Sequence, residues 1–155
     1  MKSRKAISPV IATVILVAVA ITIAVAVSYW MSGISSQYTK FEKVEIQSAQ
    51  CSAPGALYWT ITVDMKNTGT STATINSVYI NDVAADFLDG LPIVDTDINY
   101  DTGGTTGDLS IASGAPGTLT IYVGIDYESL SSGTAINIKF HSAGGMDYIK
   151  LIELV

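Results

Sequence analysis

The pattern of apolar and polar positions divides this chain into two parts with different periodicities. Val10 to Val27 is an uninterrupted run of eighteen residues drawn only from Ala, Leu, Val, Ile and Thr. From Phe41 onward, apolar residues instead alternate with polar ones in short segments. A run of roughly 20 apolar residues suffices to cross the hydrocarbon core of a bilayer, whereas alternation is typical of half-buried strands. The sequence therefore predicts one long apolar helix followed by a β-rich domain.

The helix prediction has to be weighed against a strand, because twelve of these eighteen residues are β-branched and such residues favour strands in water. A lone strand in lipid, however, leaves its backbone polar groups unsatisfied, so the run is predicted to be helical. Ser8 is a good N-cap and Pro9 a good first helical residue. A helix from Pro9 to about Tyr38 would span about 45 Å, which exceeds the ~30 Å hydrocarbon core.

Six segments of the second part have the alternation and the flanking turn residues of strands. Lys66-Asn67-Thr68-Gly69 is predicted to form a turn, and Gly144-Gly145 to lie within a closing hairpin. Between Val83 and Ala115 the pattern fades into an acidic stretch rich in Gly and Thr. We therefore predict the α+β class, with a long N-terminal hydrophobic helix followed by an antiparallel β-sandwich head of the Ig-like kind. The predicted strands are 41–49, 57–65, 73–80, 118–125, 134–141 and 147–154.

Charge is distributed unevenly around the apolar run. The formal net charge is -6, but Lys2, Arg4 and Lys5 precede the run, and the remainder has five basic and fourteen acidic residues. Basic residues ahead of an apolar helix predict that the amino end is cytoplasmic and the head lies outside. The scarcity of Lys and Arg elsewhere argues against nucleic acid as a partner.

Candidate chemistry in the head is sparse. Asp95, Asp97, Asn99 and Asp101 place oxygen ligands at alternate positions, which makes a weak calcium candidate, but Tyr100 and Thr106 stand where an EF-hand loop needs Gly and Glu. The single histidine, His141, lies in an alternating segment, where a partly buried structural role is expected. The single cysteine, Cys51, excludes an internal disulfide. The sequence thus predicts no catalytic residue, no cofactor and no enzyme.

The N-terminus is more specific, because RKAISPVIATVILVAVAITIAVAV resembles the N-terminus of archaeal type IV pilins, the subunits of adhesion pili, which are related to archaellins. In that family a prepilin peptidase removes a short basic leader ahead of the apolar run. The resemblance implies cleavage between Ala6 and Ile7, after Arg4 and Lys5, and Ile7-Ser8-Pro9-Val10-Ile11 matches the start of the mature pilins. Many bacterial type IV pilins carry Glu where this chain has Ile11, and its absence fits the archaeal group.

The resemblance implies a leader at residues 1–6, an assembly helix at 7–40 and a β-sandwich outer domain at 41–155. The helix would span the membrane before assembly and form the filament core afterwards. The expected partners are further copies of the chain in a helical homopolymer, the prepilin peptidase, the pilus assembly ATPase and the membrane platform protein. The expected location is the archaeal cell surface. The filament-core residues are expected to be Val10, Ile11, Val14, Ile15, Ala18, Ile21 and Val25.

Two alternatives remain open from the sequence. One is an archaellin-type subunit of a motility filament, because archaellins also carry a short leader ahead of an apolar segment. The other is a permanently membrane-anchored extracellular binding module, which would keep residues 1–6 and stay monomeric.

Overall fold

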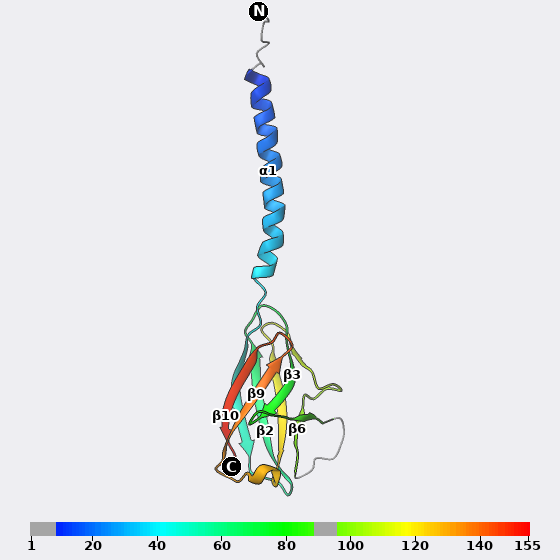
Figure 1. Cartoon of the computed structure of the whole chain (residues 1–155), viewed down its shortest axis with the longest axis vertical. Coiled ribbons are helices and arrows are strands. Elements are labelled where there is room, and N and C mark those ends of the chain that lie inside the picture. The colour runs from blue at the N-terminus through cyan, green and yellow to red at the C-terminus, as the bar shows by residue number, and fades with distance from the viewer. Residues whose placement is uncertain (1–8, 89–95) are drawn as a thin grey trace, which may run out of the picture. The chain divides into compact units, whose positions relative to one another are not determined.

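The computed structural model describes residues 9–88 and 96–155, and these fall into two units, up to Lys40 and from Phe41 onward (Figure 1). The first unit holds the helix α1, Pro9–Tyr38, which confirms the predicted helix and its end. Its β-branched residues adopt the helical state despite their strand propensity. Thr13 and Thr22 donate hydroxyl hydrogen bonds to the carbonyls of Val10 and Ala18, at 2.9 Å and 2.8 Å, so both hydroxyls have a partner within the helix.

The second unit, which we call the head, is a β-sandwich of two sheets. One sheet has the order β1-β2-β8-β6-β5, and the other has the order β10-β9-β3-β4, with β7 also pairing with β3. The strands are β1 Val44–Ser52, β2 Tyr58–Asn67, β3 Ala73–Ile80, β4 Val83–Ala84, β5 Asp86–Phe87, β6 Ile98–Asp101, β7 Leu109–Ile111, β8 Pro116–Gly124, β9 Ala135–Ser142 and β10 Asp147–Glu153, with a short 3-10 turn at Tyr127–Ser129.

The core lies between the two sheets, and the central strands alternate between buried residues and less buried ones. Every second residue of β2 is buried, and β8 and β9 follow the same pattern. Ile61 and Ile121 from the first sheet meet Ile138 and Phe140 from the second in one hydrophobic cluster. Every buried hydrophobic residue of this cluster belongs to 44–154, so the core of the head is complete without the helix.

The structure confirms the α+β class and the sandwich, and it corrects three details. The pairing of β5 with β6 is parallel, although every other strand pair among the described residues is antiparallel. The stretch from Val83 to Ala115 contains the strands β4 to β7, each only two to four residues long. Strands this short have too few positions to show a periodicity, so the sequence pattern could not reveal them.

The third correction concerns where β1 begins and where β2 ends. The first strand begins at Val44 rather than at residue 41, because the preceding backbone pairs with the β2–β3 turn: Thr70 N–H donates to the Phe41 carbonyl at 2.9 Å and Thr68 N–H to the Lys43 carbonyl at 2.8 Å. Asn67 is not a turn residue but the last, fully buried residue of β2. The predicted closing hairpin is confirmed, with β9 and β10 paired antiparallel around Gly144-Gly145.

Candidate assembly surface

The most prominent surface of this chain is α1 itself, whose apolar side chains are exposed in the monomer. All residues from Val10 to Val27 are exposed, and the large ones leave about half or more of their surface uncovered, as with Val10 at 69% and Leu16 at 70%. The seven residues predicted for a filament core lie on one face of α1, within an arc of about 140° at 100° per residue. The structure brings them together on the helix and leaves them without cover.

The polar groups along the apolar run are already satisfied within the helix. Thr13 and Thr22 are the only residues with polar side chains between Val10 and Val27, and both hydroxyls donate to backbone carbonyls one turn earlier. A threonine whose hydroxyl is bonded in this way adds little penalty for burial, because the cost of burying a polar group arises mainly when it lacks a partner. This segment can therefore be surrounded by apolar groups on every side.

Length and composition also qualify α1 as a membrane span. Pro9–Ser35, 27 residues, is apolar and long enough to cross a bilayer. The sequence contains no Asp, Glu, Lys or Arg between Lys5 and Lys40. Since a bilayer core takes roughly 20 residues, the last two or three turns of α1 extend beyond the thickness that lipid tails can cover.

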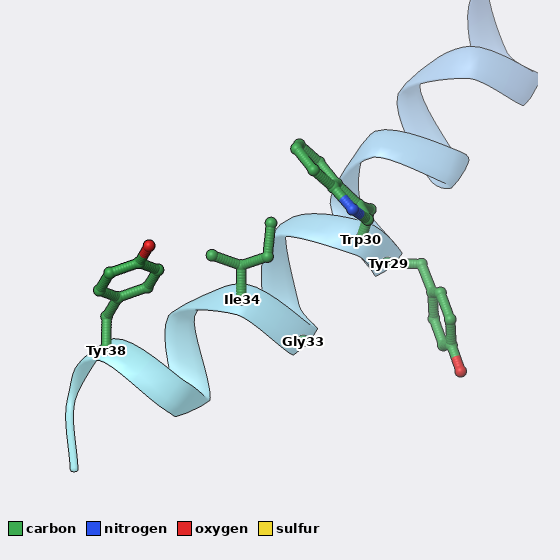
Figure 2. Close-up of a pocket in the computed structure, with 5 residues that line it drawn as sticks. All are labelled: Tyr29, Trp30, Gly33, Ile34 and Tyr38. Carbon is green, nitrogen blue, oxygen red and sulfur yellow. The ribbon is translucent and has the colours of Figure 1, made fainter.

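These last turns carry a different surface from the rest of the helix. Figure 2 shows the side chains of Trp30, Ile34 and Tyr38 on one side of α1, with Tyr29 pointing away from them. A groove of about 490 Å³ lies here, lined by Tyr29, Trp30, Gly33, Ile34 and Tyr38. All its lining residues belong to this single helix, so the groove is an open depression on the helix surface rather than an enclosed ligand cavity.

The predicted processing site falls on residues that the structure does not describe. Arg4, Lys5, Ala6, Ile7 and the predicted N-cap Ser8 all lie outside the described residues. Pro9 is the first described residue and is already helical. The cleavage between Ala6 and Ile7 therefore stays a prediction from the sequence.

The weak calcium candidate is only partly described, because Asp95 lies outside the described residues. Asn99 and Asp101 belong to β6, which pairs with β8, and Gly103 N–H donates to Asp101 Oδ1 at 2.7 Å. Among residues 9–88 and 96–155, no group of three His, Cys, Asp or Glu side chains could hold a metal ion. The contacts of Asn99 and Asp101 do not support a calcium site, and the calcium hypothesis stays an untested prediction.

The single histidine and the single cysteine of the chain both lie on strands of the head. His141 Nδ1 lies 2.5 Å from Asp147 Oδ1, so the pair links β9 to β10 beside the closing turn. The sequence did not reveal this pairing, although a hairpin register around Gly144-Gly145 places the two positions opposite each other. Cys51 is a free thiol, half-buried on β1.

One carboxylate of the head has a perturbed proton affinity with a clear cause. Asp64 on β2 accepts hydrogen bonds from the hydroxyls of Ser48 on β1, at 2.8 Å, and Thr118 on β8, at 2.9 Å. These two bonds favour the ionised form, with that from Ser48 contributing most, and they lower the pKa of Asp64. The contacts join three strands on the outer face of the first sheet, and nothing in them suggests catalysis.

Comparisons with known proteins add a likeness of fold. Neither a protein-family profile nor a curated relative matches the chain. The archaellum periplasmic stator protein FlaG from Sulfolobus acidocaldarius is 14% identical with a TM-score of 0.50, over 72% of this chain and 100% of that one. A chain in the stator complex of FlaF and FlaG from the same organism is 14% identical with a TM-score of 0.51, over 72% and 90%.

A third solved structure, the Iho670 flagellar-like filament, is 14% identical over 95% of this chain and 98% of that one, with a TM-score of 0.42. A likeness at this TM-score supports no structural conclusion. The head makes up 115 of the 155 residues. The two stator proteins match 72% of the chain, a length similar to that of the head. The likeness to the two stator proteins is therefore one of fold, and the long apolar helix precedes the head in the sequence.

Proposed function

We propose that this chain is a structural subunit of an archaeal type IV adhesion pilus, which polymerises through α1 into an extracellular filament for surface attachment. The observation that carries the proposal is the surface of α1. It is apolar on every side from Val10 to Val27, it has no charge, and its two threonine hydroxyls are satisfied within the helix. The head has a complete core of its own.

A helix of this kind requires an apolar environment on all faces. Burial of apolar surface is worth about 25 cal/mol per Å², so eighteen exposed residues favour either lipid or a bundle of neighbouring helices over water. Before assembly lipid would supply this environment, with the basic N-terminus in the cytoplasm. After assembly the helices of neighbouring subunits would supply it, and the heads would form the outer layer of the filament.

Removal of residues 1–6 would control the transition between these two states. The leader carries Lys2, Arg4 and Lys5, and moving a Lys or Arg into the middle of a bilayer costs about 2.5 to 3.5 kcal/mol on insertion scales. While the leader is present, these charges hold the amino end at the cytoplasmic interface. Cleavage between Ala6 and Ile7 would free the helix to leave the membrane and join a bundle.

The partners follow from the same proposal and from the resemblance of the N-terminus to archaeal type IV pilins. A prepilin peptidase would cut the chain, and an assembly ATPase with a membrane platform protein would drive its polymerisation. The chain itself has no Walker-type phosphate-binding loop, so the energy for assembly would come from that separate ATPase. The proposed role is structural and involves no reaction at the chain's own residues.

The processing step gives the direct test of this proposal. In cells that produce the chain, Ala6→Leu is expected to block cleavage and leave a precursor with its leader in the membrane fraction, whereas Lys2→Ala serves as a control that should still be cut. The measurement is intact mass of the membrane and sheared-filament fractions. Normal filaments built from cut Ala6→Leu subunits would refute the assigned cleavage site.

The second candidate is a permanently anchored extracellular module, and the fold of the head favours it specifically. The two solved chains that match at TM-scores of 0.50 and 0.51 are described as archaellum periplasmic stator proteins. A module of that kind would keep α1 in the membrane and dissolve in detergent as separate chains. An archaellin-type subunit would instead assemble, and its deletion would abolish swimming rather than attachment.

A further inference from the structure

The edges of the two sheets of the head differ in how well they are protected against pairing with another chain. A long, regular edge strand offers unpaired backbone groups, and proteins usually shorten or bend such strands. The edge strands β4, β5 and β7 have only two or three residues each, and the register of β1 against β2 shifts between Ile46 and Ser48, as at a β-bulge. By contrast β10, red in Figure 1, pairs with β9 without a register shift over all seven of its residues.

The free edge of β10 presents the backbone groups of every second residue. In an antiparallel ladder, alternate residues bond to the neighbouring strand and the others direct their N–H and C=O groups the other way. Just beyond β10, Leu154 N–H donates to the carbonyl of Thr134 at 3.0 Å, so the even-numbered residues of β10 face β9. Among the described residues β10 pairs with β9 alone. The residues with backbone groups at the free edge are therefore Asp147, Ile149, Leu151 and Glu153.

The same strand carries two exposed apolar side chains. Ile149 is 58% exposed and Leu151 is 69% exposed. They stand opposite Lys139 and Asn137 of β9, which belong to the outer face of the sheet because the residues between them point into the core. Branched apolar side chains at such positions gain most from a cross-strand neighbour. A further strand at this edge would supply that neighbour and pair the free backbone groups.

A second copy of β10, running antiparallel, fits this edge in one register. A pair centred on Lys150 would set the two lysines opposite each other and Asp147 opposite Glu153, and like charges directly opposite are destabilising. A shift of one residue would move the apolar side chains to opposite faces. A shift of two residues places Ile149 opposite Ile149 of the second copy and Lys150 opposite Tyr148, whose ring attracts a cation. This register removes both like-charge contacts and keeps the apolar side chains of the two copies on one face.

The area of the edge shows that one such pair is weak. A strand of seven residues is about 24 Å long, and a sheet with its side chains is about 10 Å thick, so the edge offers on the order of 240 Å² per copy. Two copies bury about 500 Å², against roughly 1,200 to 2,000 Å² in a stable interface. Single heads are therefore expected to stay apart in dilute solution. Many such pairs acting together would hold, because linked weak contacts strengthen one another.

The symmetry of the pair indicates where it can form. Two identical antiparallel strands are related by a two-fold axis, so the contact closes after two copies, whereas a helical filament grows through head-to-tail contacts that do not close. The β10 pair therefore cannot extend a single filament. We propose that β10 pairs with β10 of a copy in a second filament, so that filaments associate side by side into bundles. This inference rests on the proposed function, because it requires filaments that repeat the edge many times.

A change of charge at the edge tests the proposal on filaments of the full chain. Ile149→Lys sets two ammonium groups opposite each other and is expected to lower the bundled fraction in electron micrographs severalfold. Asn76→Lys is the matched control, because it makes the same change at an exposed position on β3 and should leave bundling unchanged. Equal bundling in the two variants would overturn the proposal, and so would single filaments of the unsubstituted chain at every concentration.

A disulfide experiment tests the occupant and its register. In a Cys51→Ser background, Ile149→Cys places two thiols opposite each other, with Cα atoms about 5.5 Å apart, which a disulfide can bridge. Filaments of normal and heavy-isotope chains are dispersed, mixed and then oxidised. Dimers of mixed mass are expected, severalfold more abundant than from Asn76→Cys. Dimers of unmixed mass only would place the contact within one filament and overturn the proposal, as would equal yields from positions 149 and 76.

Failure of the β10 contact and failure of the proposed function give different results. Intact filaments that remain single refute the β10 contact and leave the proposed function standing. If the unsubstituted chain forms no filaments and stays in membranes as monomers, the proposed function itself fails.

Discussion

Asn67 connects three segments of the head, and its removal should destabilise the head more than any surface substitution. The residue is fully buried at the end of β2. Its Nδ2 donates to the Ser71 carbonyl at 2.7 Å and to the Ile111 carbonyl at 2.8 Å, and its Oδ1 accepts from Gly69 N–H at 2.9 Å. The β2–β3 turn that it holds also pairs with Phe41–Lys43, where the chain enters the head.

The size of the effect follows from these three bonds. In Asn67→Ala, the buried Ile111 carbonyl loses its bond to Nδ2, at about 1 to 3 kcal/mol. Gly69 N–H loses its bond to Oδ1 but keeps a second one to the Lys43 carbonyl, at 3.2 Å, so this loss should cost about 0.5 to 1 kcal/mol. The bond to the Ser71 carbonyl is only partly buried, so water can replace it and its loss should cost about 0.5 to 1 kcal/mol. The sum is about 3 kcal/mol, a large share of the 5 to 15 kcal/mol that stabilises a typical domain.

Urea unfolding of the isolated head, residues 41–155, measures this loss, because the hydrophobic core is contained within 44–154. With a urea dependence of about 1.5 kcal/mol per molar, Asn67→Ala should lower the unfolding midpoint by about 2 M. Asn76→Ala is the matched control, because Asn76 is exposed on β3 and should change stability by less than about 0.5 kcal/mol. Equal midpoints for the two variants would refute the reasoning.

Three further predictions concern the head. Gly69→Ala places a Cβ 2.5 Å from the carbonyl oxygen of Phe41 and 2.6 Å from the amide nitrogen of Lys43, so thermal unfolding should show a loss of about 1 to 3 kcal/mol, and an unchanged Tm would contradict the close approach. Ser48→Ala removes the main cause of the lowered pKa of Asp64 and should raise that pKa in an NMR titration. A lowered carboxyl pKa means that the folded state is stabilised at pH values above the usual pKa of about 3.9, and this stabilisation is lost as pH falls through the folded pKa. Ser48→Ala should therefore lower stability near neutral pH, with the difference from the parent chain vanishing in acid, and an unmoved Asp64 titration would count against this account. Ile138→Ala, at a fully buried position, should cost about 2 to 5 kcal/mol in urea unfolding, and a loss below about 1 kcal/mol would show that the core has been misassigned.

The sequence predicted the long elements of this fold because their patterns are long. The end of α1 at Tyr38 and the closing β9–β10 hairpin both followed from runs of seven or more residues. For α1, length and apolarity outweighed the strand propensity of its β-branched residues. The strands β4 to β7 escaped prediction because two to four residues cannot display a period.

Single polar residues were harder to predict, because their roles depend on tertiary contacts. Asn67 stands in a segment that reads as a turn, yet its side chain is buried against Ile111 from a distant strand. The hydroxyl donors of Asp64 likewise come from two other strands. For the assembly surface, the apolar run and Trp30 were evident in the sequence, whereas the alignment of Trp30 with Ile34 and Tyr38 became clear on the helix itself (Figure 2).

The central claim is that the chain is cut and then assembled, and one measurement tests it most directly. Protein sheared from the cell surface is collected as a filament-containing fraction, and its intact mass and N-terminal sequence are determined. The account predicts subunits that begin at Ile7 and lack Met1 to Ala6. Chains that begin at Met1 and occur only in membranes, as detergent-soluble monomers, would contradict it and favour the anchored module.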